Sequence, residues 1–159
     1  MGCGAGLDAI FMAEQGLYVL GVDSSRKALK IARSRADKKR VKVEWLAADL
    51  FDLPLENEAI DFVTDRGLFH VIDDNDRPRY SSEVRRILKP KGFVMIRGAS
   101  ENVGQDRFNA VTKSAVDRFF QRSEWSIGPV VSLPLFSPAG EIDARMVILE
   151  KKGEKSSKR

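Results

Sequence analysis

The sequence begins, after Met1, with the stretch GCGAG at residues 2–6. Glycine at alternate positions removes Cβ atoms where a buried strand turns tightly into a helix, and it lets a nucleoside-bearing ligand approach the backbone. Such a loop normally follows a strand, and only Met1 precedes it in this sequence. The stretch therefore predicts a ligand site in an α/β sheet that lacks its first central strand.

Composition sets the broad class of the protein. A chain of 159 residues that is 43% hydrophobic can bury the core of one domain. The segment 151–159 holds five basic residues and one acidic residue, and this excess of four equals the whole net charge of +4. We therefore expect a balanced domain over residues 1–150, a basic disordered tail over residues 151–159, and no nucleic-acid partner.

Cysteine usage and hydropathy exclude several other classes. The single Cys3 excludes an internal disulfide and a multi-cysteine metal site. We find no signal peptide and no apolar run of membrane-spanning length, so the sequence predicts a cytoplasmic protein with no membrane partner and no metal.

Apolar spacing along the first hundred residues alternates between helical and strand periods. The expected elements are a helix carrying Leu7, Ile10 and Phe11 and ended by Gly16; a strand over 18–22; a helix capped by Ser24 or Ser25; strands over 41–45 and 60–64; a helix carrying Tyr80, Val84, Ile87 and Leu88 and ended by Pro90 and Gly92; and a strand over 93–96.

The last third of the sequence predicts a different pairing. Ser114 and Asp117 have the spacing of a helix capping box. Apolar runs over 125–135 and 146–149 flank the turn Pro138-Ala139-Gly140 and resemble an antiparallel pair. The fold class is therefore α/β, a mostly parallel sheet with an antiparallel C-terminal hairpin, and ligands of such sheets lie beyond the carboxyl ends of the strands.

Two aspartates stand at those strand ends. Asp23 follows the second strand and can accept hydrogen bonds from both ribose hydroxyls, and Asp49 follows the third and can accept one from an adenine amino group. Asp23 could instead only cap the next helix, and Asp49 could form an Asx turn. Leu7 stands where a dinucleotide-binding loop has its last glycine, which disfavours an NAD-dependent oxidoreductase.

Five segments together resemble the class I S-adenosylmethionine-dependent methyltransferases: GCGAG, VLGVDSS, AADLFDLP, AIDFVTDRGLFHVI and RRILKPKGFVMI. The resemblance implies a Rossmann-like sandwich, S-adenosylmethionine as cofactor, and methyl transfer to a small-molecule acceptor. The residues that it assigns to the cofactor are Gly2, Cys3, Gly4, Gly6, Asp23, Ser24, Asp49 and Leu50. Cys3 is also explained by a loop that accepts only a small side chain.

The segment Asp65-Arg66-Gly67, with His70 after it, resembles the small-molecule branch that includes thiopurine S-methyltransferase-like enzymes. The resemblance implies that Arg66 faces the acceptor. A thiol acceptor needs no strong base, whereas a hydroxyl needs one, for which His70 and Asp65 are the candidates. Arg66 could instead pair with an acid, and His70, between apolar residues, could be structural.

The sequence also departs from the family pattern. It lacks the usual N-terminal cap, the first strand and the acid before the glycine loop, and Lys91 replaces a common glycine, which we expect to be tolerated if Lys91 does not need a positive φ. Two alternatives therefore stay open: a truncated enzyme, and a cofactor-binding or structural protein without activity. Unpaired strand edges would favour oligomers, including a homo-oligomer, or low stability.

Overall fold

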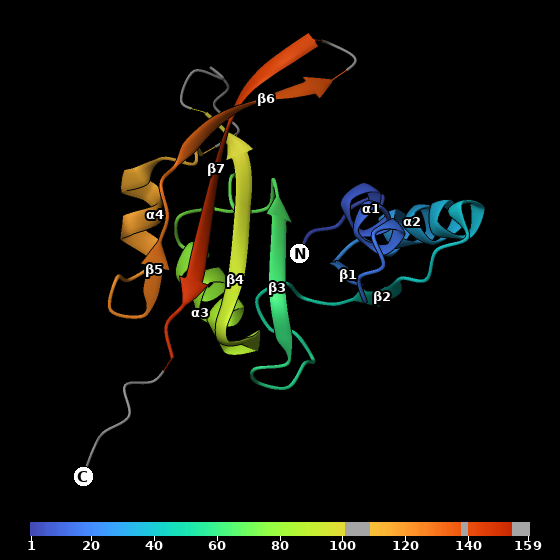
Figure 1. Cartoon of the computed structure of the whole chain (residues 1–159), viewed down its shortest axis with the longest axis horizontal. Coiled ribbons are helices and arrows are strands. Elements are labelled where there is room, and N and C mark those ends of the chain that lie inside the picture. The colour runs from blue at the N-terminus through green and yellow to red at the C-terminus, as the bar shows by residue number, and fades with distance from the viewer. Residues whose placement is uncertain (101–108, 138–139, 154–159) are drawn as a thin grey trace. The chain divides into compact units, whose positions relative to one another are not determined.

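The computed structural model describes residues 1–100, 109–137 and 140–153. The chain forms two compact units, Met1–Pro54 and Leu55–Arg159, whose elements are labelled in Figure 1. We describe each unit by itself, and the expectation of one domain over residues 1–150 stays a prediction.

The first unit alternates helices and parallel strands. Ser25 begins the second helix by accepting a hydrogen bond from the Ala28 N–H at 3.2 Å, and so it is the cap among the two predicted serines. The strand predicted over residues 18–22 begins two residues later, at Leu20, and the Tyr18 side chain is exposed. The elements are α1 (Leu7–Glu14), β1 (Leu20–Asp23), α2 (Arg26–Lys39) and β2 (Glu44–Ala47), with β1 and β2 paired in parallel.

The Trp45 ring on β2 leaves no room for a side chain at two positions of this unit, Gly6 and Gly21. A Cβ atom on Gly6 would lie 2.6 Å from the Trp45 ring, and one on Gly21 would lie 2.4 Å from it. Ala32 of α2 is fully buried and stands equally close to the position of a Gly6 Cβ, at 2.7 Å. The indole therefore packs where only glycine leaves room, which fixes the glycine loop against β1 and α2.

The second unit is built on a mixed sheet. Its strands follow the order β3-β4-β7-β5, with β6 also paired to β7. β3 and β4 are parallel, while β7 is antiparallel to β4, β5 and β6. This confirms the predicted antiparallel end of the sheet, with the run 125–135 divided into two strands. The strands are β3 (Ile60–Arg66), β4 (Leu88–Ala99), β5 (Trp125–Ile127), β6 (Val131–Ser137) and β7 (Gly140–Lys151).

Two helices, α3 (Arg77–Ile87) and α4 (Lys113–Phe119), complete the second unit. Tyr80 of α3 lies edge-on to Phe120, with ring centroids 6.3 Å apart, and Phe120 lies edge-on to Trp125 of β5 at 5.4 Å. All three rings are buried, so both helices share one aromatic core with the sheet. No helix in the described part of the chain is long and apolar enough to cross a bilayer.

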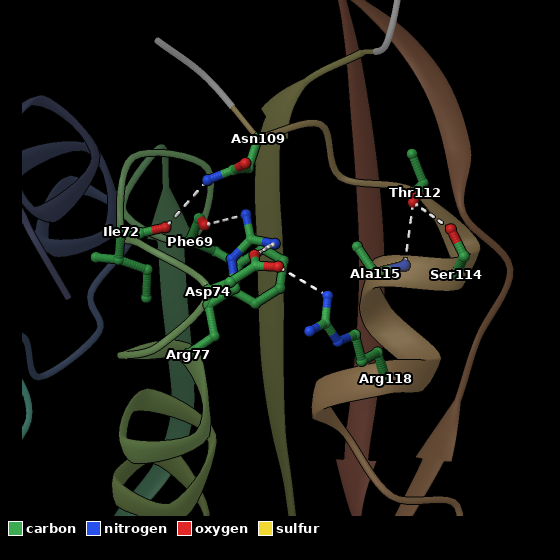
Figure 2. Close-up of polar contacts among 9 residues, drawn as sticks. All are labelled: Phe69, Ile72, Asp74, Arg77, Asn109, Thr112, Ser114, Ala115 and Arg118. Carbon is green, nitrogen blue, oxygen red and sulfur yellow. Dashed lines mark hydrogen bonds and ion pairs between the residues drawn. The ribbon is translucent and has the colours of Figure 1, made fainter. Parts of the chain in front are cut away.

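The predicted capping box of α4 is wrong. The hydroxyl of Thr112, not Ser114, accepts the Ala115 N–H at 3.0 Å, and it also shares a hydrogen bond with the Ser114 hydroxyl (Figure 2). Asp117 instead pairs with Lys113 and with Arg122. Thr112 is in extended conformation, as an N-cap residue requires, and the helix begins one residue after it.

Lys151 is the last residue of β7 and so does not belong to the predicted tail. Its buried ammonium donates to Glu58 at 2.9 Å and to the Leu88 carbonyl at 2.6 Å. Residues 154–159 of that tail, and Pro138 and Ala139 of the predicted turn, lie outside the described residues.

The parallel strands fall into two sheets. Among the described strands, β1 pairs only with β2, and β3 pairs only with β4.

Lys91 does not meet the condition under which loss of the glycine would be tolerated. Its φ is 64°, in the left-handed region, so the position does require the positive φ that a glycine would adopt without strain. Lys91 is exposed, and its side chain gains no burial in return.

Replacing Lys91 with glycine should therefore stabilise the protein. We expect Lys91→Gly to raise the free energy of unfolding by about 0.5–1 kcal/mol, because it removes left-handed strain. Urea denaturation measures the change. Lys91→Ala retains a Cβ and should give no gain; an equal gain in both variants would contradict the strain argument.

Candidate functional site

The glycine loop after Met1 is held in a left-handed conformation at three positions. Gly2, Gly4 and Gly6 have φ values of 60°, 51° and 80°. Gly6 is needed for packing against Trp45, whereas a Cβ on Gly4 would meet nothing within 4 Å. Gly4 therefore faces open space, as it must if a ligand approaches the loop backbone.

Asp23, at the end of β1, fixes this loop. Its Oδ2 accepts the Gly4 N–H at 2.7 Å, and its Oδ1 accepts the Ser25 N–H at 2.8 Å. The side chain is partly buried, and each carboxylate oxygen has lone-pair capacity for a further hydrogen bond. Asp23 can thus position the loop and also accept hydroxyl protons from a ribose. Ser24 beside it is exposed.

The segment after β2 lies next to the end of β1. The Ala48 N–H donates to the Asp23 carbonyl at 3.3 Å. Asp49 forms an Asx turn, in which Oδ1 accepts the Phe51 N–H at 2.9 Å, and its side chain is exposed. Leu50 is buried. The turn was one of the two alternatives for Asp49, and it leaves the second carboxylate oxygen for a ligand.

Cys3 is unsuited to nucleophilic chemistry. Burial, with the nearby Asp23 carboxylate adding to it, raises the pKa of the Cys3 thiol to about 11. The thiol therefore stays protonated near neutral pH. Among the described residues there is no group of His, Cys, Asp and Glu that could hold a metal ion.

Asp65, near the end of β3, holds the loop that follows. Its Oδ1 accepts the Leu68 N–H at 2.7 Å, and its Oδ2 accepts the Phe69 N–H at 2.9 Å and the Tyr80 hydroxyl at 2.7 Å. The side chain is fully buried, and burial raises the pKa of its carboxyl group. The sequence indicated Tyr80 only as an apolar position of a helix, because its contact with Asp65 arises only in the folded chain.

His70 lies against two glycines. A Cβ on Gly67 would stand 3.1 Å from Nε2, and one on Gly98 would stand 2.9 Å from Nδ1. The Ala99 N–H donates to Nδ1 at 2.8 Å. Burial lowers the pKa of His70, with the Asp65 carboxylate opposing and Arg77 adding to this shift. The imidazole is therefore neutral near pH 7 and has its proton on Nε2.

A polar network anchors the same loop to its surroundings. The Arg77 guanidinium lies 4.3 Å from the Phe69 ring centroid and donates to the Phe69 carbonyl at 3.0 Å. Asp74 pairs with both Arg77 and Arg118 of α4, at 3.1 and 2.8 Å (Figure 2). Asn109 donates to the Ile72 carbonyl at 3.3 Å (Figure 2).

The structure thus gathers the predicted residues into two groups. Those assigned to the cofactor all lie in the first unit, and Asp65, Arg66 and His70 all lie in the second. Arg66 is exposed at the end of β3 and stands opposite Arg97 in the register with β4.

The sequence profile of the methyltransferase-domain family matches residues 1–92. The chain belongs to this family. A ubiquinone biosynthesis O-methyltransferase from Bordetella avium is 32% identical over 128 residues, which cover 79% of this chain and 52% of that protein. Thiocyanate methyltransferase 1 from Brassica oleracea is 32% identical over 95 residues, covering 59% and 42%. The chain therefore spans about half the length of these methyltransferase relatives.

A solved structure supports the fold of this methyltransferase-family chain. A SAM-dependent methyltransferase from Methanosarcina mazei superposes with a TM-score of 0.84 at 19% identity, covering 96% of this chain and 91% of that one. The Rossmann-like methyltransferase fold predicted from the sequence is confirmed.

Two glycines of the first unit allow a matched test of the glycine loop. Gly4 and Gly16 both have positive φ, 51° and 83°, and a Cβ on either would meet nothing within 4 Å. We expect alanine at either position to lower the free energy of unfolding by about 1 kcal/mol through left-handed strain. Only Gly4→Ala should weaken binding of S-adenosylhomocysteine in calorimetric titration, by about tenfold or more. Equal affinity in the two variants would contradict the loop assignment.

Proposed function

We propose that this protein transfers a methyl group from S-adenosylmethionine to a small-molecule acceptor by direct displacement. The observation that carries the proposal is the double hydrogen bond of Asp23 to the Gly4 and Ser25 N–H groups. It orders the glycine loop around a partly buried carboxylate that retains acceptor capacity for ribose hydroxyls. Asp49 and the buried Leu50 would border the adenine.

The donor supplies an activated sulfonium methyl group, so the residues of this chain mainly bind and orient. Gly2, Gly4 and Gly6 would let the methionine portion approach the backbone. Alignment of the nucleophile with the methyl carbon and exclusion of water can lower the barrier by about 7–11 kcal/mol at most.

The relatives support the class of acceptor. One is named as an O-methyltransferase of ubiquinone biosynthesis and another as a thiocyanate methyltransferase, and both names refer to small molecules. The resemblance of the Asp65-Arg66-Gly67 segment to thiopurine S-methyltransferase-like enzymes supports a role for the exposed Arg66 beside the acceptor.

The Asp23 assignment can be tested by donor binding. We expect Asp23→Ala to weaken S-adenosylhomocysteine binding by roughly tenfold or more, because a charged hydrogen-bond partner is worth about 1.5–3 kcal/mol. Asp37→Ala, at an exposed position of α2, is the matched control and should bind normally. Thermal melts of both variants separate loss of binding from loss of folding. An unchanged dissociation constant in folded Asp23→Ala would remove the ribose assignment.

The role of Arg66 can be tested by separating turnover from donor binding. We expect Arg66→Ala to lower methyl transfer to an accepted small molecule while the donor affinity stays within a few-fold of the original. Arg79→Ala, which removes an exposed arginine of α3, should leave both unchanged. If Arg66→Ala lost donor binding as well, Arg66 would belong to the donor site or to folding.

A further inference from the structure

We infer that the acceptor enters the methyl-transfer step as an anion already formed in solution, a thiolate or an acidic phenolate. This rests on the proposed methyl transfer and names the substrate class of that same site. The reason lies in Asp65 and His70, the two side chains that the sequence offered as bases for a neutral hydroxyl. The hydrogen bonds of both residues oppose that role.

Asp65 cannot reach a substrate proton. Its two oxygens accept three hydrogen bonds, from the Leu68 N–H, the Phe69 N–H and the Tyr80 hydroxyl, at 2.7–2.9 Å. Its side chain is fully buried. Because the carboxylate is fully buried behind these three donors, an acceptor cannot come within hydrogen-bond distance of it, so Asp65 is a positioning residue for the loop rather than a base.

His70 is able to donate a hydrogen bond but not to take a proton. The Ala99 N–H can only donate, so Nδ1, which lies 2.8 Å from it, must be the unprotonated nitrogen. The neutral ring then carries its hydrogen on Nε2. Protonation at Nδ1 would set two N–H groups against each other, and Gly67 and Gly98 confine the ring on both sides. The charged groups that act on the imidazole are Asp65 and Arg77.

Within the described part of the second unit, the other carboxylates at this edge are paired with arginines or open to solvent. Asp74 pairs with Arg77 and Arg118, Asp76 with Arg79, and Asp143 with Arg145. Asp73 is exposed. A carboxylate in water is a weak base toward an ordinary hydroxyl, whose proton is held far more tightly.

The reaction balances without a proton transfer. A lone pair of the acceptor anion forms the new bond to the methyl carbon as the bond from that carbon to the sulfonium breaks, and the released pair returns to sulfur. The anion and the sulfonium charge cancel, which leaves the neutral methylated acceptor and a neutral thioether. The acceptor's proton has gone to water beforehand.

The test compares acceptors of different acidity. Benzenethiol, 4-nitrophenol and phenol, whose pKa is about 10 like that of tyrosine, are offered with S-adenosylmethionine, and kcat/KM is measured against pH. We expect the midpoint of each profile to follow the acceptor's own pKa, and phenol to react slowest near neutral pH. His70→Asn, in which Oδ1 can still accept the Ala99 N–H, should leave each midpoint in place. One midpoint shared by all acceptors and abolished in His70→Asn would overturn the inference.

A second readout does not depend on activity. His70 is the only histidine of the chain, so its ring nitrogens give an unambiguous pair of ¹⁵N resonances. We expect a protonated Nε2 and an unprotonated Nδ1 near neutral pH, and the reverse tautomer would overturn the inference. If none of the acceptors is methylated, the proposed methyl transfer to these acceptors fails. The tautomer still shows whether the ring nitrogen of His70 that faces away from Ala99 can act as a base.

Discussion

The structure depends on aspartates at the ends of parallel strands whose oxygens accept backbone N–H groups of the following or adjoining loop. Asp23 does this for the glycine loop, and Asp65 does it for the loop after β3. In both places, hydrogen bonds to a charged carboxylate take over where the backbone hydrogen bonds between strands end. The two differ in access: Asp23 is only partly buried, whereas Asp65 is fully buried and also accepts the Tyr80 hydroxyl. The Asp23 carboxylate can therefore accept hydrogen bonds from a ligand, whereas the Asp65 carboxylate only stabilises the fold.

This difference connects the fold with the proposed chemistry. Because the donor methyl group is already activated, the protein has mainly to position two molecules and exclude water. Asp65 holds the loop through Leu68 and Phe69, and Arg77 and Asp74 tie that loop to α4. His70 is held by Ala99 between two glycines. A loop held in this way is better suited to positioning the acceptor than to transferring a proton.

Much of the first unit could be predicted from the sequence because its signals are local. The glycine spacing, the strand that ends in Asp23 and the serine cap all fall within a few residues of one another. Asp65 and His70 could not be interpreted in this way. Tyr80 lies 15 residues after Asp65, and Ala99 lies 29 residues after His70, so the contacts that define their protonation exist only in the folded chain. The requirement for glycine at position 21 likewise depends on Trp45, which comes from another strand. Whether Lys91 needs a positive φ could not be decided from the sequence, because the residue lies where the register between β3 and β4 shifts, between Leu88 and Phe93.

Amide NMR titrations of the protein with S-adenosylhomocysteine and, separately, with NAD would show which residues contact the donor. We expect S-adenosylhomocysteine to shift the amide resonances of residues 2–6, 23–25 and 49–51, with the largest shifts including Gly4 and Ser25, because their N–H groups donate to Asp23. NAD should leave these resonances in place. Shifts produced by NAD alone, or shifts by S-adenosylhomocysteine confined to other residues, would contradict the assignment of the glycine loop, Asp23 and Asp49 to the donor.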